Sequence, residues 1–255
     1  VLTNAGAVYR NGFFAYDDRQ RGGVDLAEFR TSGGNDVTIV SKGNRLELYD
    51  AQNRLIRSVA PFGEGWNRGM TFGFGKAGNK PYVVVGAAQG GVPYVRMYTE
   101  SLEPVTDAFF AYDQRFLGGV NVAVGDIDGD GGPDITVGAG PGGGPHVRVF
   151  GTDKAVKAQF FAYDQRFHGG VYVAMGDVDG DKAQEIVTGP GFGGGPHVRV
   201  WNARAQVENQ FFAFDSAKRG GARVSVGDID GDGRFEILAM TNDAFTLALG
   251  FHNIF

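Results

Sequence analysis

The chain of 255 residues is rich in glycine and has no cysteine. Its 43 glycines and 9 prolines are too many for a helical bundle, while 42% hydrophobic residues are enough for a core and exclude a disordered chain. The absence of Cys excludes disulfides and thiolate sites, the net charge of −5 argues against non-specific nucleic-acid binding, and the strand-sized apolar runs predict no membrane span.

An internal repeat of about 50 residues organises the sequence. The segments from Gly125 to Phe150 and from Gly176 to Trp201 are identical at 16 of 26 positions. A motif FFAYD or FFAFD recurs four times along the chain. Its first two copies are separated by about twice the repeat length, and Phe62 is taken as the weaker equivalent between them. The equivalent positions are Phe14, Phe62, Phe110, Phe161 and Phe212. Five units therefore make up one domain over residues 1–255.

Each unit is predicted to form four short strands, because its apolar runs alternate and favour β-branched and aromatic residues. In the third unit the strands are expected at 120–124, 135–137, 146–150 and 156–163. This pattern predicts an all-β fold, a five-bladed β-propeller of four-stranded antiparallel blades. The last unit supplies strands at 222–226, 236–240 and 245–251. We expect the segment 7–16 to complete that blade and close the ring.

An acidic loop between the first and second strands recurs in three units. It has the spacing D-x-D-x-D with a further carboxylate at position nine. The carboxylates are Asp126, Asp128, Asp130 and Asp134, then Asp177, Asp179, Asp181 and Glu185, then Asp228, Asp230, Asp232 and Glu236. Four carboxylates so close together repel one another unless a cation lies between them, and an all-oxygen set favours Ca²⁺ over Mg²⁺. The backbone carbonyls of Gly132, Ala183 and Arg234 are expected to complete three Ca²⁺ sites.

These loops have two other interpretations. A helical EF-hand is unsuitable, because position twelve holds Val137, Thr188 and Ala239 instead of a bidentate Glu, and strands flank the loop. The remaining alternative is an Asp-Gly-rich hairpin turn without metal. The first two units lack the acidic spacing, so no metal is expected there. Three bound dications would turn the net charge of −5 slightly positive.

The order of strand, GDxDGDGxxD loop, strand, GAGP and a glycine-rich turn into HVRVF resembles the FG-GAP/VCBS repeats of integrin α-subunit propellers and many bacterial surface proteins. The similarity is strongest from Phe109 to Glu236. It implies that the three acidic loops hold Ca²⁺. That family usually has seven blades, so five blades are a departure from it. The resemblance is compatible with adhesion and with carbohydrate-related roles, between which a fold does not choose.

The connections at the opposite end of the predicted propeller combine basic and aromatic side chains. The candidate ligand-binding residues are Arg19, Trp66, Arg68, Arg115, Phe116, Arg166, Phe167 and Arg219. Guanidinium groups beside aromatic rings can bind the carboxylates or sulfates of an acidic polysaccharide or a protein. The alternative is that Arg115 and Arg166 pair with Asp113 and Asp164, two residues earlier, and fix the turns.

No sequence feature indicates catalysis, since no nucleophile elbow, metal-hydrolase motif or isolated His/carboxylate group occurs. His146 and His197 are interpreted as structural, with a shared transition-metal site as the alternative. We expect a non-catalytic, calcium-stabilised recognition, adhesion or scaffold module that is extracellular, at the cell surface or periplasmic. A lectin-like or acidic-polysaccharide-processing protein is the alternative. The chain starts at Val1, as expected of a processed form or an excised piece.

Overall fold

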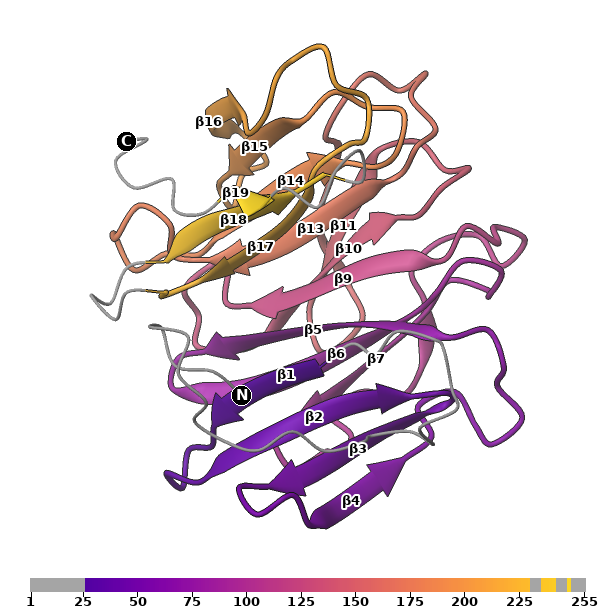
Figure 1. Ribbon diagram of the computed structural model, residues 1–255, viewed down its shortest axis with the longest axis vertical. Coiled ribbons are helices and arrows are strands. Elements are labelled where there is room, and N and C mark those ends of the chain that lie inside the picture. Colours follow the sequence, from indigo (N-terminus) through magenta and orange to yellow (C-terminus); the bar gives the residue numbers. More distant parts are fainter. Residues whose placement is uncertain (1–25, 230–234, 242–246, 249–255) are drawn as a thin grey trace.

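The computed structural model describes residues 26–229, 235–241 and 247–248. Five antiparallel sheets follow one another along this part of the chain (Figure 1). The first four contain four strands each and the fifth contains three, and in every sheet the strands pair in the order of the sequence. The described residues include no helix that could cross a membrane. The architecture is therefore all-β and built from successive meanders.

The strands recur with the period of the sequence repeat. The first sheet contains β1 (Leu26–Arg30), β2 (Asp36–Lys42), β3 (Arg45–Asp50) and β4 (Leu55–Val59). The second contains β5 (Met70–Ala77), β6 (Lys80–Ala87), β7 (Tyr94–Thr99) and β8 (Phe109–Phe110). The third contains β9 (Val120–Gly125), β10 (Asp134–Ala139), β11 (His146–Phe150) and β12 (Val156–Phe161). The fourth contains β13 (Val171–Gly176), β14 (Glu185–Pro190), β15 (His197–Trp201) and β16 (Val207–Phe212). The fifth contains β17 (Arg223–Gly227), β18 (Glu236–Met240) and β19 (Leu247–Ala248).

The predicted strands of the third unit coincide with β9 to β12 within one or two residues at their ends. The expected fourth strand runs to Tyr163, whereas β12 ends at Phe161. Pairing stops there because the next partner is Pro145, which accepts from the amide of Ala162 but has no N–H to donate in return. The predicted closing strand at 7–16, and most of the strand at 245–251, lie outside the described residues.

The hydrophobic core lies between neighbouring sheets. Val84 of β6 and Met97 of β7 pack in one cluster with Val122 of β9 and Ile135 of β10, and the same arrangement joins the third sheet to the fourth and the fourth to the fifth. A single blade could not bury these side chains, because each face needs an adjacent sheet as its cover. The backbones of neighbouring sheets lie very close together. A Cβ on Gly189 would lie only 1.9 Å from the carbonyl oxygen of Ala222.

The repeated aromatic motif connects each sheet to the next. The hydroxyl of Tyr112 donates to the carbonyls of Val137 and His146 at 2.8 Å. Tyr163 makes the equivalent bonds to Thr188 and His197. Burial raises the pKa of both tyrosines, so that each remains a neutral donor. Phe109 and Phe160 also pack across to the next sheet, against Phe150 and Trp201, whereas Phe161 and Phe212 stack within their own sheets.

Phe62 corresponds to Tyr112 in three dimensions, two positions beyond the Phe110 with which the sequence repeat aligns it. Phe62 contacts Trp66 and Tyr94, as Tyr112 contacts Phe116 and His146. The sequence carries this register in its spacing, because Phe62, Trp66 and Gly69 are as far apart as Tyr112, Phe116 and Gly119, although the FFAYD motif itself is absent from this unit.

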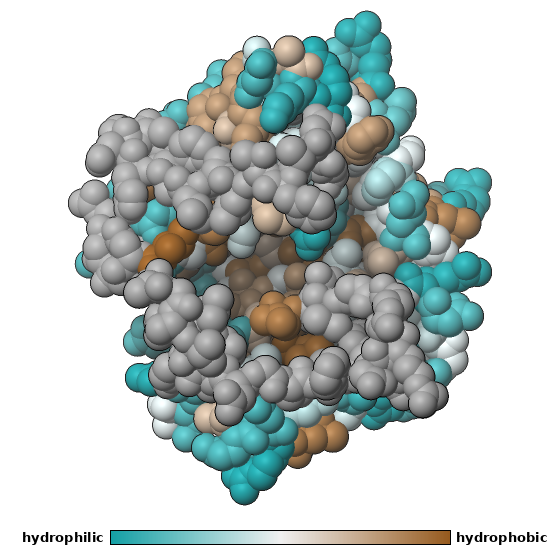
Figure 2. Space-filling model, in the orientation of Figure 1, coloured by the Kyte–Doolittle hydropathy of each residue, from teal (hydrophilic) through white to brown (hydrophobic). Residues whose placement is uncertain are grey.

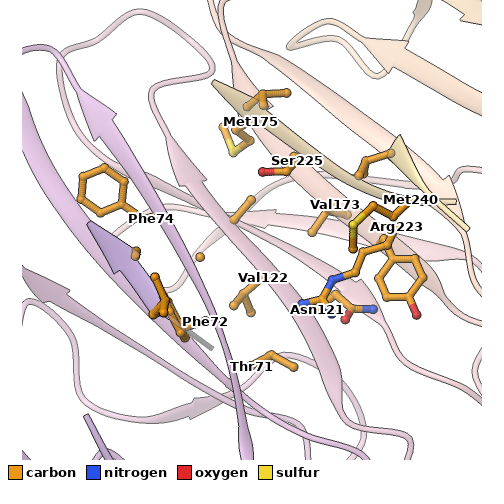
Figure 3. Close-up of a pocket in the computed structure, with 18 of the residues that line it drawn as sticks. Thr71, Phe72, Phe74, Asn121, Val122, Val173, Met175, Arg223, Ser225 and Met240 are labelled. Carbon is orange, nitrogen blue, oxygen red and sulfur yellow. The ribbon is translucent and has the colours of Figure 1, made fainter. Parts of the chain in front are cut away.

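The first strands of all five sheets line one cavity of about 700 Å³. Figure 2 shows apolar side chains in the hollow at the centre of the molecule. The lining is mostly apolar, with Asn121 of β9 and Arg223 of β17 together at one end (Figure 3). Sheets arranged radially around a shared cavity, each with its first strand innermost, define a β-propeller.

Candidate metal centre

The acidic loops connect antiparallel strands at one end of the sheets. One joins β9 to β10, the next joins β13 to β14, and the third joins β17 to β18. The strands on both sides confirm that these loops are hairpins and not EF-hands. The pairing of Gly125 with Asp134 and of Gly176 with Glu185 places the ninth carboxylate at the start of the second strand, where it is buried.

Three carboxylates of the β9–β10 loop converge. Oxygen atoms of Asp126, Asp128 and Asp134 lie within 4.8 Å of one another. Two oxygens bound to one Ca²⁺ at about 2.4 Å are at most about 4.8 Å apart, so this spacing suits a single ion. Asp126 Oδ2 accepts the amide of Gly131 at 2.9 Å, while its Oδ1 is buried without a hydrogen-bond partner among the described residues. An unpartnered, buried carboxylate oxygen fits a place for a cation.

The β13–β14 loop repeats this arrangement with Asp177, Asp179 and Glu185. Glu185 Oε2 accepts the amide of Val178 at 3.0 Å, as Asp134 accepts that of Ile127. Burial raises the pKa of Glu185 to about 8, and the charges of the neighbouring aspartates add to that effect. The loop thus carries more negative charge than it can hold without a cation or a proton.

The third loop is described in part. The amide of Ile229 donates to Glu236 Oε2 at 2.7 Å, which is the same contact as in the other two loops. Glu236 is buried at the start of β18. The predicted ligands Asp230, Asp232 and Arg234 lie outside the described residues.

The carboxylates at position five do not belong to the two converging groups. Asp130 Oδ1 accepts the amide of Gly132 at 2.7 Å, and Asp181 Oδ1 accepts that of Ala183 at 2.8 Å. These side chains hold the turn, in the manner of Asx turns. Of the four carboxylates predicted for each loop, the structure therefore brings three together in the β9–β10 and β13–β14 loops.

A lysine from another strand of the same sheet, which the loop motif does not include, reaches the carboxylates of the β9–β10 loop. Lys157 Nζ, from β12, lies 2.6 Å from Asp134 Oδ1 and 2.8 Å from Asp128 Oδ2. Burial lowers the pKa of this ammonium, but its bonds to the two aspartates outweigh that effect and raise it. The hydrogen bond from Lys157 also lowers the pKa of Asp128, whereas burial still keeps that of Asp134 raised.

Gln184 is a second contributor that the repeat does not reveal. Its Oε1 accepts the amide of Asp126 at 2.9 Å, and its Nε2 donates to the carbonyl of Lys76 at 3.0 Å. One side chain thus ties the β13–β14 loop to the second and third sheets. The equivalent residue of the previous unit is Pro133, so the alignment of repeats gives no signal for this role.

At the opposite end, the arginines of the expected ligand face are paired within their own turns. Arg115 donates to both carboxylate oxygens of Asp113, and Arg166 does the same to Asp164. These bonds lower the pKa of each aspartate well below its usual range. The alternative in which each Arg fixes its turn agrees with this geometry. Both guanidinium groups are nevertheless about 90% exposed.

The other candidates at this end differ in their surroundings. Phe116 and Phe167 pack beside Gly118 and Gly169, and the indole of Trp66 donates to the carbonyl of Gly69 at 2.8 Å. Arg68 is exposed, and Arg219 donates to the carbonyls of Ser216 and Lys218. Arg19 lies outside the described residues.

The two histidines pack as structural residues. His146 stacks on Phe161 and His197 on Phe212, each with ring centroids 4.7 Å apart and within its own sheet. Burial lowers the pKa of both imidazoles. Among the described residues, no group of three metal-binding side chains includes either histidine.

Comparisons with known proteins support the fold. No family model and no curated protein matches the sequence. Among solved structures, the Dos1 propeller matches with a TM-score of 0.53 at 13% identity, over 84% of this chain and 51% of that chain. An inactive virginiamycin B lyase from Staphylococcus aureus, solved with quinupristin, matches with a TM-score of 0.53 at 7% identity, over 88% and 73%. BBS1N in complex with ARL6DN has a TM-score of 0.50 at 12% identity, over 81% and 59%.

The chain is thus similar in fold to several β-propellers and spans about half the length of the Dos1 propeller chain. At these identities the likeness concerns the fold alone. A lyase and other kinds of protein share that fold, so function has to be argued from the site.

Proposed function

We propose that this protein is a non-catalytic β-propeller whose acidic loops bind Ca²⁺ and which serves as a recognition, adhesion or scaffold module. The observation that carries the proposal is the convergence of Asp177, Asp179 and Glu185 within 4.8 Å, with Glu185 buried. A hard ion with oxygen ligands relieves both the repulsion and the cost of burying the carboxylate.

A structural role for the ion follows from the place of the loops. Each joins the innermost strand of a blade to the second strand, so a bound ion fixes the turn from which two strands start. Ca²⁺ would supply charge neutralisation and would orient the carboxylates. Among the described residues, the carboxyl groups with raised pKa values are Asp134 and Glu185; both lie in these loops, so they serve ion binding in this proposal. Millimolar Ca²⁺ outside the cytoplasm would keep such sites filled, which favours an extracellular, surface or periplasmic location.

The proposal is tested by thermal unfolding with millimolar Ca²⁺ and with excess EDTA. At a free ion concentration of about 100 times Kd, each filled site adds about 2.7 kcal/mol to the free energy of unfolding. For a chain of this size that is about 5–10 °C in Tm. A Tm that is the same in Ca²⁺ and EDTA would reject the metal sites. A Tm increase that is as large with Mg²⁺ would reject the preference for Ca²⁺.

A second candidate is binding of an acidic polysaccharide at the opposite end. It is favoured by exposed aromatic rings near the exposed guanidinium groups: Phe161 is 42%, Phe212 52% and Phe192 69% exposed. Rings of this kind can stack on sugars while Arg binds carboxylates or sulfates. A glycan array with neutral and acidic sugars tests this candidate. Loss of acidic-glycan binding in Arg115→Ala with Arg166→Ala, at unchanged Tm, would support it, whereas failure of the wild-type protein to bind any acidic glycan would reject it.

A further inference from the structure

The β9–β10 loop already contains a cation that belongs to the protein. The ammonium of Lys157 lies 2.6 Å from Asp134 Oδ1, 2.8 Å from Asp128 Oδ2 and 3.5 Å from Asp130 Oδ2. It therefore lies among carboxylates of the group that would hold a metal ion. The Asp134 side chain is 1% and the Lys157 side chain 31% exposed, so the aliphatic part of the lysine also covers the loop.

The equivalent position in the next blade has the opposite charge. Phe150 pairs with Val156 in the third sheet, and Trp201 pairs with Val207 in the fourth. The residue that follows is Lys157 in one case and Glu208 in the other. Glu208 lines a small cavity together with Asp181 and Glu185, and its Oε1 accepts a hydrogen bond from Asn202 Nδ2 at 2.9 Å.

No basic side chain takes the role of Lys157 in the β13–β14 loop. Among the described residues, no Lys or Arg nitrogen lies within 4.0 Å of a carboxylate of Asp177, Asp179, Asp181 or Glu185. The two loops have nearly the same backbone and the same converging carboxylates. They differ in the charged residues around them: Glu208 replaces Lys157, Lys182 replaces Gly131, and Arg204, which lines the same cavity as Glu208, replaces Asp153.

We propose that the two loops are not equivalent: Lys157 is a built-in counter-ion that replaces the metal in the β9–β10 loop, and the β13–β14 loop, whose carboxylates form no ion pair with a described Lys or Arg, is the site that takes a divalent ion. This inference rests on the proposed function and narrows it, because the β9–β10 loop is then not one of the Ca²⁺ sites. A divalent ion can enter the β9–β10 loop only if the ammonium leaves, because both occupy the space between Asp128 and Asp134. One blade is thereby stabilised at any Ca²⁺ concentration, while its neighbour responds to the ion.

The test is to count bound Ca²⁺ by native mass spectrometry and to measure its affinity by calorimetry. Lys157→Gln is expected to bind one ion more per chain than the wild-type protein, with a gain of at least tenfold in the affinity of that loop. Glu208→Lys is expected to bind one ion fewer. Lys154→Gln is the matched control, because it removes the same charge three residues earlier, in the turn that leads into β12, and among the described residues Lys154 forms no ion pair with the acidic loops.

A measurement on the wild-type protein makes the test independent of how well the variants fold. An amine-reactive reagent followed by peptide mapping should modify Lys157 at least tenfold more slowly than Lys154 in EDTA. Low-millimolar Ca²⁺ should leave that protection unchanged. Equal reactivity of the two lysines, or deprotection of Lys157 by low Ca²⁺, would overturn the inference.

The outcomes separate the inference from the proposed function. If the wild-type protein binds Ca²⁺ and Lys157→Gln leaves the ion count unchanged, the inference fails while the metal sites stand. If neither the wild-type protein nor Lys157→Gln binds Ca²⁺, both fail. If Lys157→Gln alone gains an ion and Lys154→Gln does not, the assignment of Lys157 is established.

Discussion

Glu185 should make the metal-free protein less stable as the pH rises. Burial raises the pKa of Glu185 from 4.5 to about 8. Between these two values the folded protein keeps a proton that the unfolded chain has lost. The stability from this group is therefore complete below about pH 4.5 and disappears as the pH rises to about 8. Glu185→Gln, which is neutral at every pH, should remove this dependence.

The size of the effect follows from the size of the shift. Each pKa unit corresponds to about 1.4 kcal/mol, so a shift from 4.5 to about 8 sets an upper limit of about 5 kcal/mol. Solvent around the loop screens part of the interaction, and we expect about 2–3 kcal/mol. At pH 9 in EDTA, the variant should be more stable than the wild-type protein by this amount, and at pH 5 the two should be nearly equal.

The assay is urea denaturation of both proteins from pH 5 to pH 9, with EDTA and with Ca²⁺. The difference between the two proteins isolates Glu185, because His146 and His197 titrate in both and their lowered pKa values act in the opposite direction. Ca²⁺ should reverse the order at pH 8, since it stabilises the ionised carboxylate that only the wild-type protein has. A wild-type protein whose stability in EDTA, relative to the variant, does not fall between pH 5 and pH 9 would refute the reasoning.

Three further predictions concern how the blades hold together, and each is measured by urea denaturation. Tyr163→Phe should lower the free energy of unfolding by about 1–3 kcal/mol, because two buried strand carbonyls lose their donor. Gly189→Ala should lower the free energy of unfolding by about 3 kcal/mol, because the new Cβ would lie 1.9 Å from the carbonyl oxygen of Ala222. Gly227→Ala is the matched control: its new Cβ meets no described atom within 4 Å, so the free energy of unfolding should fall by less than about 1 kcal/mol. Gln184→Ala should cost about 1–2 kcal/mol through loss of its two bonds between blades, and an unchanged midpoint would show that these bonds contribute nothing.

The sequence alone determined the repeat, the strand positions and the acidic hairpins. The reason is local: alternation of apolar residues specifies a strand, and the D-x-D-x-D spacing with its glycines specifies a turn. The pairing of Asp113 with Arg115 could be predicted for the same reason, because the two residues are neighbours in one turn.

Only the tertiary structure decided which charges meet. Lys157 is 23 residues or more from the aspartates that it contacts, and it reaches them because the last strand of the blade starts at the end where the acidic loop lies. Gln184 contacts residues 58 and 108 positions away in two other blades. Contacts between strands and blades depend on how the sheets are arranged around the cavity, and a one-dimensional repeat does not contain that information.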